Sequence, residues 1–311
     1  SSFKPNLQLV HDHANSDSTK EYIQEKDAKI RYANKLYDKS KPVGERSIAS
    51  NYLKDHRSIT CKLSSDIKTT GIYDQSEKEY LPALIAYARD AYGNITGGQH
   101  LLLNKETKGK ADLSVPKKSF GVISGSFVDL GNASSNGNSY SNIGNNKAKL
   151  EITIIAEGLE TGLSVKQSLS EHSEKGGNTK NISIKTLCSL GISNIKNYEP
   201  IQGQKIIIAS DNDGKDSITN KTIHDAASIL KEKGAFVEIV TPENHGDFND
   251  VLRDKENSGS KAVANSFGGA IDRHSSNTLL QYFASKDQSF TLSKDESKKV
   301  DYLSQFKINE E

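Results

Sequence analysis

Two short apolar runs that end abruptly in acidic residues constrain the fold of this chain more than any other feature. Residues 152–156 lead directly into Glu157, and residues 205–209 lead into Asp211 and Asp213. Apolar runs of this length are typical of buried strands in a parallel sheet. Since ligands bind at the carboxyl ends of such strands, the three carboxylates are expected to lie at one edge of an α/β sheet.

Three carboxylates in this arrangement are the ligands that a hard divalent cation such as Mg²⁺ prefers. A cation at that edge indicates phosphate chemistry on nucleotides or nucleic acid, because bound metal ions neutralise the charge that develops during phosphoryl transfer. Gly158 would let the backbone approach a phosphate closely. Further along, Asp247 and Asp250 extend the acidic cluster, although Asp250 could instead cap a helix.

The composition narrows the class of protein. The chain has 311 residues, 34% of them hydrophobic, and a mean hydropathy of -0.64, which suits two modest domains without a membrane span. We expect a cytoplasmic protein with no membrane partner. Its two cysteines, Cys61 and Cys188, form no CxxC pair, so no zinc is expected. Because the sequence lacks Met and begins with Ser1, we interpret it as part of a larger polypeptide.

Net charge is +1, which excludes a protein that binds DNA through bulk positive charge alone. The charge is distributed unevenly, since residues 1–62 are mildly basic and residues 151–254 are acidic. An acidic domain beside a basic one suits a metal site flanked by a surface for the phosphate backbone. Ordinary variation of surface charge explains the same pattern equally well.

Periodicity and turn residues divide the chain into segments. We predict a disordered or linker segment at 1–20, a helical lead-in at 21–62, a β-rich subdomain at 63–131, a flexible Ser/Asn/Gly linker at 132–148, an α/β domain at 149–254 and a helical extension at 255–311. The β-rich subdomain is expected to close with a strand at 127–130. Within the α/β domain, the predicted strands are 151–156, 182–188, 205–210 and 235–240, and the predicted helices are 160–171 and 217–233. Weak helices are expected near 277–284 and 296–306.

Glu157-Gly158 after one strand and Asp211-Asn212-Asp213 after another resemble the signature of the toprim domain. The segments 156–164 (AEGLETGLS) and 247–252 (DFNDVL) are similar to toprim primases of plasmids and phages, including those fused to conjugative relaxases. The sequence departs from that pattern twice. Gly246 stands where the branch usually has Lys, and Asp216 stands where the family usually has Gly.

The resemblance implies a roughly four-stranded parallel sheet preceded by a helical lead-in and a small β-rich subdomain. It also implies a Mg²⁺ or Mn²⁺ cofactor held by Asp211 and Asp213, with Glu157 as a ligand or general acid and base. Lysines near both ends of the β-rich subdomain would bind nucleotide or template; Lys110 and Lys118, or its neighbour Lys117, occupy those places. The implied partners are single-stranded DNA, nucleoside triphosphates, and relaxase or helicase domains of a larger polypeptide.

Three functions from different classes fit these features. The leading hypothesis is a primase-type nucleotidyltransferase that makes RNA primers on single-stranded DNA, as part of a plasmid or phage replication or conjugation protein. The second is a metal-dependent toprim nuclease that uses the same acids. The third is a toprim module that binds nucleic acid without catalysis. Template preference, the number of metals, the oligomeric state and the activity of this segment alone are not encoded in any pattern that we can identify.

Overall fold

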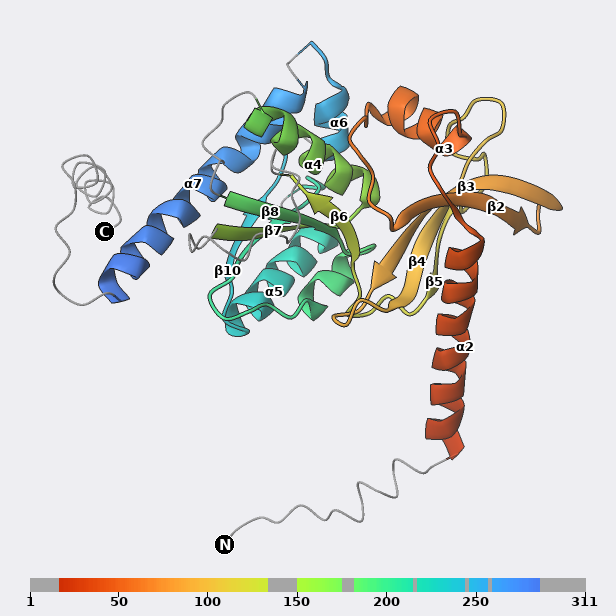
Figure 1. The fold of residues 1–311 in the computed structure, drawn as a ribbon, viewed down its shortest axis with the longest axis horizontal. Helices are drawn as coiled ribbons and strands as arrows, with labels where there is room; N and C mark the ends of the chain where they lie inside the picture. The colour runs from red at the N-terminus through yellow and green to blue at the C-terminus, as the bar shows by residue number, and fades with distance from the viewer. Residues whose placement is uncertain are drawn as a thin grey trace, which may run out of the picture.

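Two five-stranded sheets organise the molecule (Figure 1). The computed structural model describes residues 17–133, 150–174, 182–214, 217–243, 246–256 and 259–285. The predicted linker at 132–148, Asp216 and the predicted helix at 296–306 lie mostly or wholly outside these ranges. None of the helices in the described part of the chain is long and apolar enough to cross a membrane.

Helices form the first part of the described chain, as predicted for the lead-in. Helix α2 packs Ala33 and Leu36 against the first sheet. Ser47 begins the next helix because its side chain accepts a hydrogen bond from the backbone N–H of Ser50. The elements are α2 (Asp17–Lys39), the short strand β1 (Lys41–Pro42), α3 (Ile48–Asn51) and one π-helical turn, η1 (Tyr52–His56).

The first sheet is antiparallel, in the order β1-β2-β3-β4-β5. Its strands are β2 (Ile67–Asp74), β3 (Glu79–Arg89), β4 (Ile95–Leu102) and β5 (Lys117–Gly121). Side chains alternate between its two faces. Ile85 and Tyr87 of β3 pack towards α2, whereas Leu84 and Ala86 join a core that is shared with the second sheet.

The second sheet has the order β10-β9-β7-β8-β6 and is parallel except at β6. Its strands are β6 (Val128–Asn132), β7 (Leu150–Ala156), β8 (Ile182–Cys188), β9 (Lys205–Ala209) and β10 (Phe236–Val240). The four predicted parallel strands are confirmed. The strand predicted at 127–130 is present as β6, but it pairs antiparallel with β8 and forms the edge of this sheet, and not part of the first one. No local pattern in the sequence tells an edge strand which sheet it will join.

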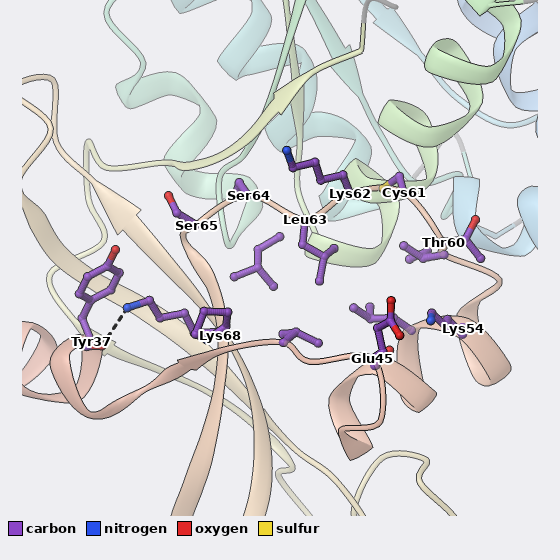
Figure 2. A pocket seen from close by; sticks show the side chains of 16 residues that line it. Tyr37, Glu45, Lys54, Thr60, Cys61, Lys62, Leu63, Ser64, Ser65 and Lys68 are labelled. Carbon is purple, nitrogen blue, oxygen red and sulfur yellow. Dashed lines mark hydrogen bonds between the residues drawn. The ribbon is translucent and has the colours of Figure 1, made fainter. Parts of the chain in front are cut away.

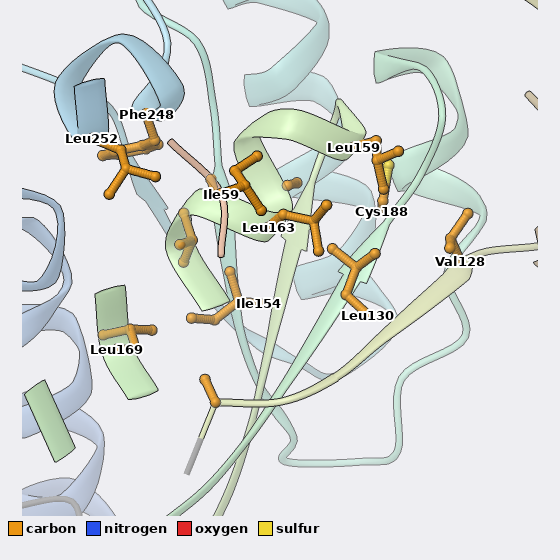
Figure 3. Close-up of a cluster of buried hydrophobic side chains, with 14 of the residues drawn as sticks. Ile59, Val128, Leu130, Ile154, Leu159, Leu163, Leu169, Cys188, Phe248 and Leu252 are labelled. Carbon is orange, nitrogen blue, oxygen red and sulfur yellow. The ribbon is translucent and has the colours of Figure 1, made fainter. Parts of the chain in front are cut away.

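Helices cover both faces of the second sheet (Figure 1). They are α4 (Leu159–Glu174), the 3₁₀ turn η2 (Ile192–Asn197), α5 (Ile218–Glu232), α6 (Phe248–Arg253) and α7 (Gly259–Ser285). Ile154 packs towards α4 and α6, whereas Ile155, one residue on, packs towards α5. Figure 3 shows the hydrophobic cluster that contains Ile154. In it Leu163 of α4, Leu130 of β6 and Ile59 of the lead-in meet. The core is therefore continuous across the two sheets.

Helix α7 begins at Gly259, well before the weak helix predicted at 277–284. Its first half buries Val263, Phe267 and Ile271 beside α4 and α6. The Ser, Lys and Gly residues between these apolar positions obscured the helical period. The prediction therefore found only the end of this helix.

Candidate active site

The register of the second sheet brings two acidic residues to the same edge. Ala156, the last residue of β7, pairs with Ala209, the last residue of β9. Glu157 follows Ala156 directly, and Asp211 follows Ala209 after one residue. Since parallel strands end on the same side, both carboxylates emerge at the edge where ligands bind in sheets of this kind.

Glu157 is partly buried at the mouth of the sheet. The pKa of its carboxyl group is raised, chiefly by burial; Lys117 acts against this shift and Asp213 adds to it. The backbone N–H of Ile192, at the start of η2, donates a hydrogen bond to the same carboxylate. A half-buried acid with a raised pKa and a fixed orientation is suited to proton transfer near neutral pH.

Among the carboxyl groups at this edge, Asp211 has the largest shift in pKa. Its pKa is raised to about 7 by burial, then by the negative charges of Asp247 and Glu157. The hydroxyl of Thr161 donates to Asp211 Oδ1 over 3.3 Å and opposes the shift only partly. Three carboxylates therefore repel one another in a small space, and a bound cation would relieve that repulsion.

A cavity of about 270 Å³ opens beside these acids. The second half of the chain contributes Glu157, Asp211 and Asp247, which we call the acidic group. The first half contributes Arg57, Lys110 and Lys117, which we call the basic group. The other lining residues are Gln99, Gly158, Glu160, Thr161, Leu190, Gly191 and Asp250.

Asp213, which the sequence predicts as a metal ligand, lies outside the cavity wall. It is exposed, although its charge still raises the pKa of Glu157 and Asp211. Gly158 does line the wall. A Cβ built at Gly158 would meet only Thr161 Oγ1, at 3.8 Å. The protein itself therefore leaves that space open, and any requirement for glycine there comes from a ligand.

The acids near 250 combine a structural role with a place in the cavity wall. Asp247 is the N-cap of α6 and accepts from the backbone N–H of Asp250 over 2.8 Å, while the Asp250 carboxylate accepts from the N–H of Asp247. This is a capping box with Asp at its third helical position. Asp250 therefore takes part in capping the helix, as expected, although the N-cap residue itself is Asp247.

Lys117, and not Lys118, turns towards the cavity. In the β4–β5 pairing Lys117 lies opposite Leu101, whose side chain points into the shared core, whereas Lys118 lies opposite His100 on the other face. Consistently, the charge of Lys118 acts on Asp74 and His100. Lys110 also lies in the cavity wall, and burial lowers the pKa of its amine. The two-residue period of a strand decides between neighbouring lysines, but the sequence alone left the face of β5 open.

Sequence analysis missed Arg57, Gln99 and Glu160. Glu160 lies three residues after Glu157 in the first turn of α4, and it is partly buried in the cavity wall. Burial acts to raise the pKa of Glu160, but Lys117 and a hydrogen bond from Tyr52 outweigh it, so the pKa is lowered. Arg57 ends the short basic turn at residues 54–57 that follows Tyr52 and Leu53, and this turn is the one signal that could have identified it.

The donor chemistry of the acidic group fits a hard divalent cation. Within the described residues, however, no three His, Cys, Asp or Glu side chains converge closely enough to hold an ion as they stand. Residues Glu157, Asp211 and Asp247 are the candidates that line the cavity.

Replacing Asp211 by Asn is expected to stabilise the metal-free protein at high pH. A carboxyl with a folded-state pKa near 7 contributes stability below its unfolded pKa, and that contribution is lost as pH rises through about 7. Above that pH the wild type carries an unfavourable buried charge that Asn lacks. The melting temperature of Asp211→Asn should therefore exceed that of the wild type by more at about pH 8.5 than at about pH 5. An equal difference at both values would contradict the crowding of carboxylates.

Replacing Lys117 by Ala is expected to weaken the binding of inorganic triphosphate by about tenfold, the loss typical of one charge-assisted hydrogen bond. Lys118→Ala provides the matched control, since it removes the same charge from the opposite face of the same strand. Isothermal titration calorimetry of both variants measures the difference. Similar losses in the two would show that overall charge matters and the cavity does not.

A second cavity, of about 490 Å³, lies between α2, α3 and the segment 59–68 (Figure 2). Its lysine nearest to Tyr37 is already engaged, because Lys68 Nζ donates to the Tyr37 carbonyl over 3.1 Å and sits 3.2 Å from the centre of the Tyr37 ring. Glu45 is its only acidic lining residue. This cavity lacks the facing acids and bases of the first one.

Comparison with known families identifies two regions. Residues 152–258 match the family model of the toprim domain, and residues 27–130 match a domain of unknown function (DUF7146). The chain therefore contains a toprim domain, which includes Glu157, Asp211 and Asp247. No curated protein matches the sequence.

Several solved primase structures are distantly similar. The Aquifex aeolicus primase (zinc-binding and RNA polymerase domains) is 14% identical with a TM-score of 0.34, covering 81% of this chain and 56% of that one. A DnaG primase catalytic domain bound to single-stranded DNA is 11% identical with a TM-score of 0.39, covering 78% and 80%. The E. coli primase catalytic core is 10% identical with a TM-score of 0.30, covering 81% and 77%. This chain thus spans little more than half of the Aquifex chain, and the toprim assignment rests on the family match.

Proposed function

Starting from a chain that contains a toprim domain, we propose that it is a metal-dependent nucleotidyltransferase of the DNA primase type. The observation that carries the proposal is the cavity in which the acidic group of the toprim domain meets the basic group of the preceding region. Phosphoryl transfer needs both, because metal-binding acids and phosphate-binding bases must act on the same substrate.

Each group has a separate task in this proposal. Asp211, with Asp213 and Asp247, would hold Mg²⁺ or Mn²⁺, and Glu157 would act as ligand or as general acid and base. When bound, the cation neutralises charge on the phosphates and aligns nucleophile with leaving group. Arg57, Lys110 and Lys117 would bind the phosphates of a nucleoside triphosphate, and burial of Lys110 strengthens such contacts.

The proposed substrates follow from these two roles, metal binding by the acidic group and phosphate binding by the basic group. We infer nucleoside triphosphates as the source of the transferred nucleotide and single-stranded DNA as the template. The similarity of 156–164 and 247–252 to primases of plasmids and phages supports a place in a replication or conjugation protein. Relaxase or helicase domains of a longer polypeptide remain part of the proposal.

Primer synthesis on single-stranded DNA, with labelled ribonucleotides and Mg²⁺ or Mn²⁺, tests the function. The wild type should yield short labelled products, and Asp211→Ala/Asp213→Ala should yield none. Cleavage of the template that the same variant abolishes, without new products, would identify a nuclease. Neither activity, with retained binding to single-stranded DNA, would identify a binding module.

A further inference from the structure

One hydrogen-bonded chain crosses from the toprim domain to the basic group. The Tyr52 hydroxyl donates to Glu160 Oε1 over 2.8 Å, and its oxygen accepts from Arg57 Nε over 2.9 Å. Glu160 lies in the first turn of α4, whereas Tyr52 and Arg57 belong to the lead-in, more than one hundred residues earlier. Glu160 and Arg57, the two side chains bonded to the Tyr52 hydroxyl, both line the cavity. The phenol therefore links two charged groups of opposite sign in one wall.

Arg57 is also fixed from its other side. Asn249 Nδ2 donates to the Arg57 carbonyl over 2.8 Å and to Ser164 Oγ over 2.9 Å, and Arg57 Nη1 approaches Asn249 Oδ1 at 3.4 Å. Asn249 is fully buried. The backbone of Arg57 is thus held by Asn249, and the direction of its guanidinium is set by Tyr52.

Glu160 lies among cations. Lys117, Lys110 and Arg57 all interact electrostatically with it. The same cations also act on the acidic group, Lys117 on Glu157 and the other two on Asp247. Glu160 differs from those acids because it accepts the Tyr52 hydroxyl and because its pKa is lowered, whereas theirs are raised. Glu160 is better described as the counter-charge that keeps the basic group assembled in the absence of a phosphate ligand.

We propose that Tyr52 is a positioning residue that, anchored on Glu160, aims the Arg57 guanidinium at the phosphates of a bound nucleoside triphosphate. The Nε–H of Arg57 donates its hydrogen bond to Tyr52, and this bond sets the direction of the outer guanidinium N–H groups. A guanidinium oriented before binding loses less side-chain entropy when a phosphate arrives. This inference rests on the proposed function.

Calorimetry with inorganic triphosphate tests the inference. Tyr52→Phe retains every charge and the ring, and it is expected to weaken binding by about 5–10-fold. In an Arg57→Lys background, which keeps the charge but lacks Nε, the same substitution should change binding by less than about twofold, because Tyr52 acts through Arg57. A purely structural role of Tyr52 would not depend on which residue occupies position 57.

Tyr87→Phe is the matched control. Tyr87 is also fully buried, its hydroxyl lies 2.6 Å from Ser40 Oγ, and it is not in the cavity wall. This variant should bind triphosphate like the wild type. Wild-type affinity in Tyr52→Phe, or an equal loss in both backgrounds, would overturn the inference.

Primer synthesis by the wild type separates this inference from the proposed function. Primer synthesis together with an unchanged Tyr52→Phe affinity rejects the inference and leaves the function intact. Triphosphate binding that depends on Tyr52, without primer synthesis, rejects the function and retains the positioning role. Absence of triphosphate binding in the wild type rejects the inference, whatever the assay of primer synthesis shows.

Discussion

Glu157→Gln is expected to lower the rate of primer synthesis by about 10²–10⁴-fold, the usual contribution of a general acid or base. Gln keeps the shape of Glu157 and its hydrogen bond from the backbone N–H of Ile192, but it cannot exchange a proton. The raised pKa of Glu157 places its titration closer to neutral pH, where such exchange is most effective. Single-turnover rates on a primed complex measure the loss.

The control for this variant removes a carboxylate outside the cavity. Glu199→Gln loses an exposed ion pair with Lys233 at 2.8 Å and should retain the wild-type rate. Glu157→Gln should also melt no lower than the wild type, since it removes a partly buried charge beside other acids. A rate within about threefold of the wild type would eliminate Glu157 as the acid or base.

Phe248→Ala is expected to lower the free energy of unfolding by about 3–5 kcal/mol. Phe248 belongs to the Asp247-Phe248-Asn249-Asp250 segment that the sequence placed near the chemistry. Its ring is fully buried, however, within the hydrophobic cluster of Figure 3. It packs against Phe267 of α7 with ring centres 5.0 Å apart. Truncation would leave a cavity between α4, α6 and α7. Urea unfolding followed by circular dichroism measures the change.

Phe236→Ala provides the same chemical change at an exposed position. Phe236 is 46% exposed on the edge strand β10, and its loss should cost less than about 1 kcal/mol. If Phe248→Ala unfolded at the same urea concentration as the wild type, its ring would not be part of the core. A loss of triphosphate binding without loss of stability would then assign it to the ligand.

The elements of the toprim domain could be predicted because their signals are local. Each strand is an apolar run with a defined end, and an apolar stripe predicts the buried face of α5. Four residues of that stripe are buried as expected, Ile223, Ala226, Ala227 and Leu230, but Ile218 at the start of the helix is exposed. The position of Glu157 and Asp211 at one edge follows from parallel pairing alone. By contrast, the partner of β6 and the start of α7 depend on which surfaces remain uncovered after the rest has packed.

The position of the basic group in the candidate site could not be predicted from local signals either. Nothing near Arg57 in sequence indicates that it faces Glu160, since 102 residues separate them and the contact passes through Tyr52. The choice of Lys117 over Lys118 is made by the register of β5 on β4.

The sequence by itself thus determined the α/β sheet, the acids at its edge and the kind of chemistry that they suit. Only the tertiary structure decided which bases meet them, because that meeting depends on how the antiparallel sheet and the lead-in pack against α4. Asn249 shows the physical reason most directly. Its buried amide ties Arg57 to Ser164 across two regions of the chain, and such a contact exists only after both have folded together.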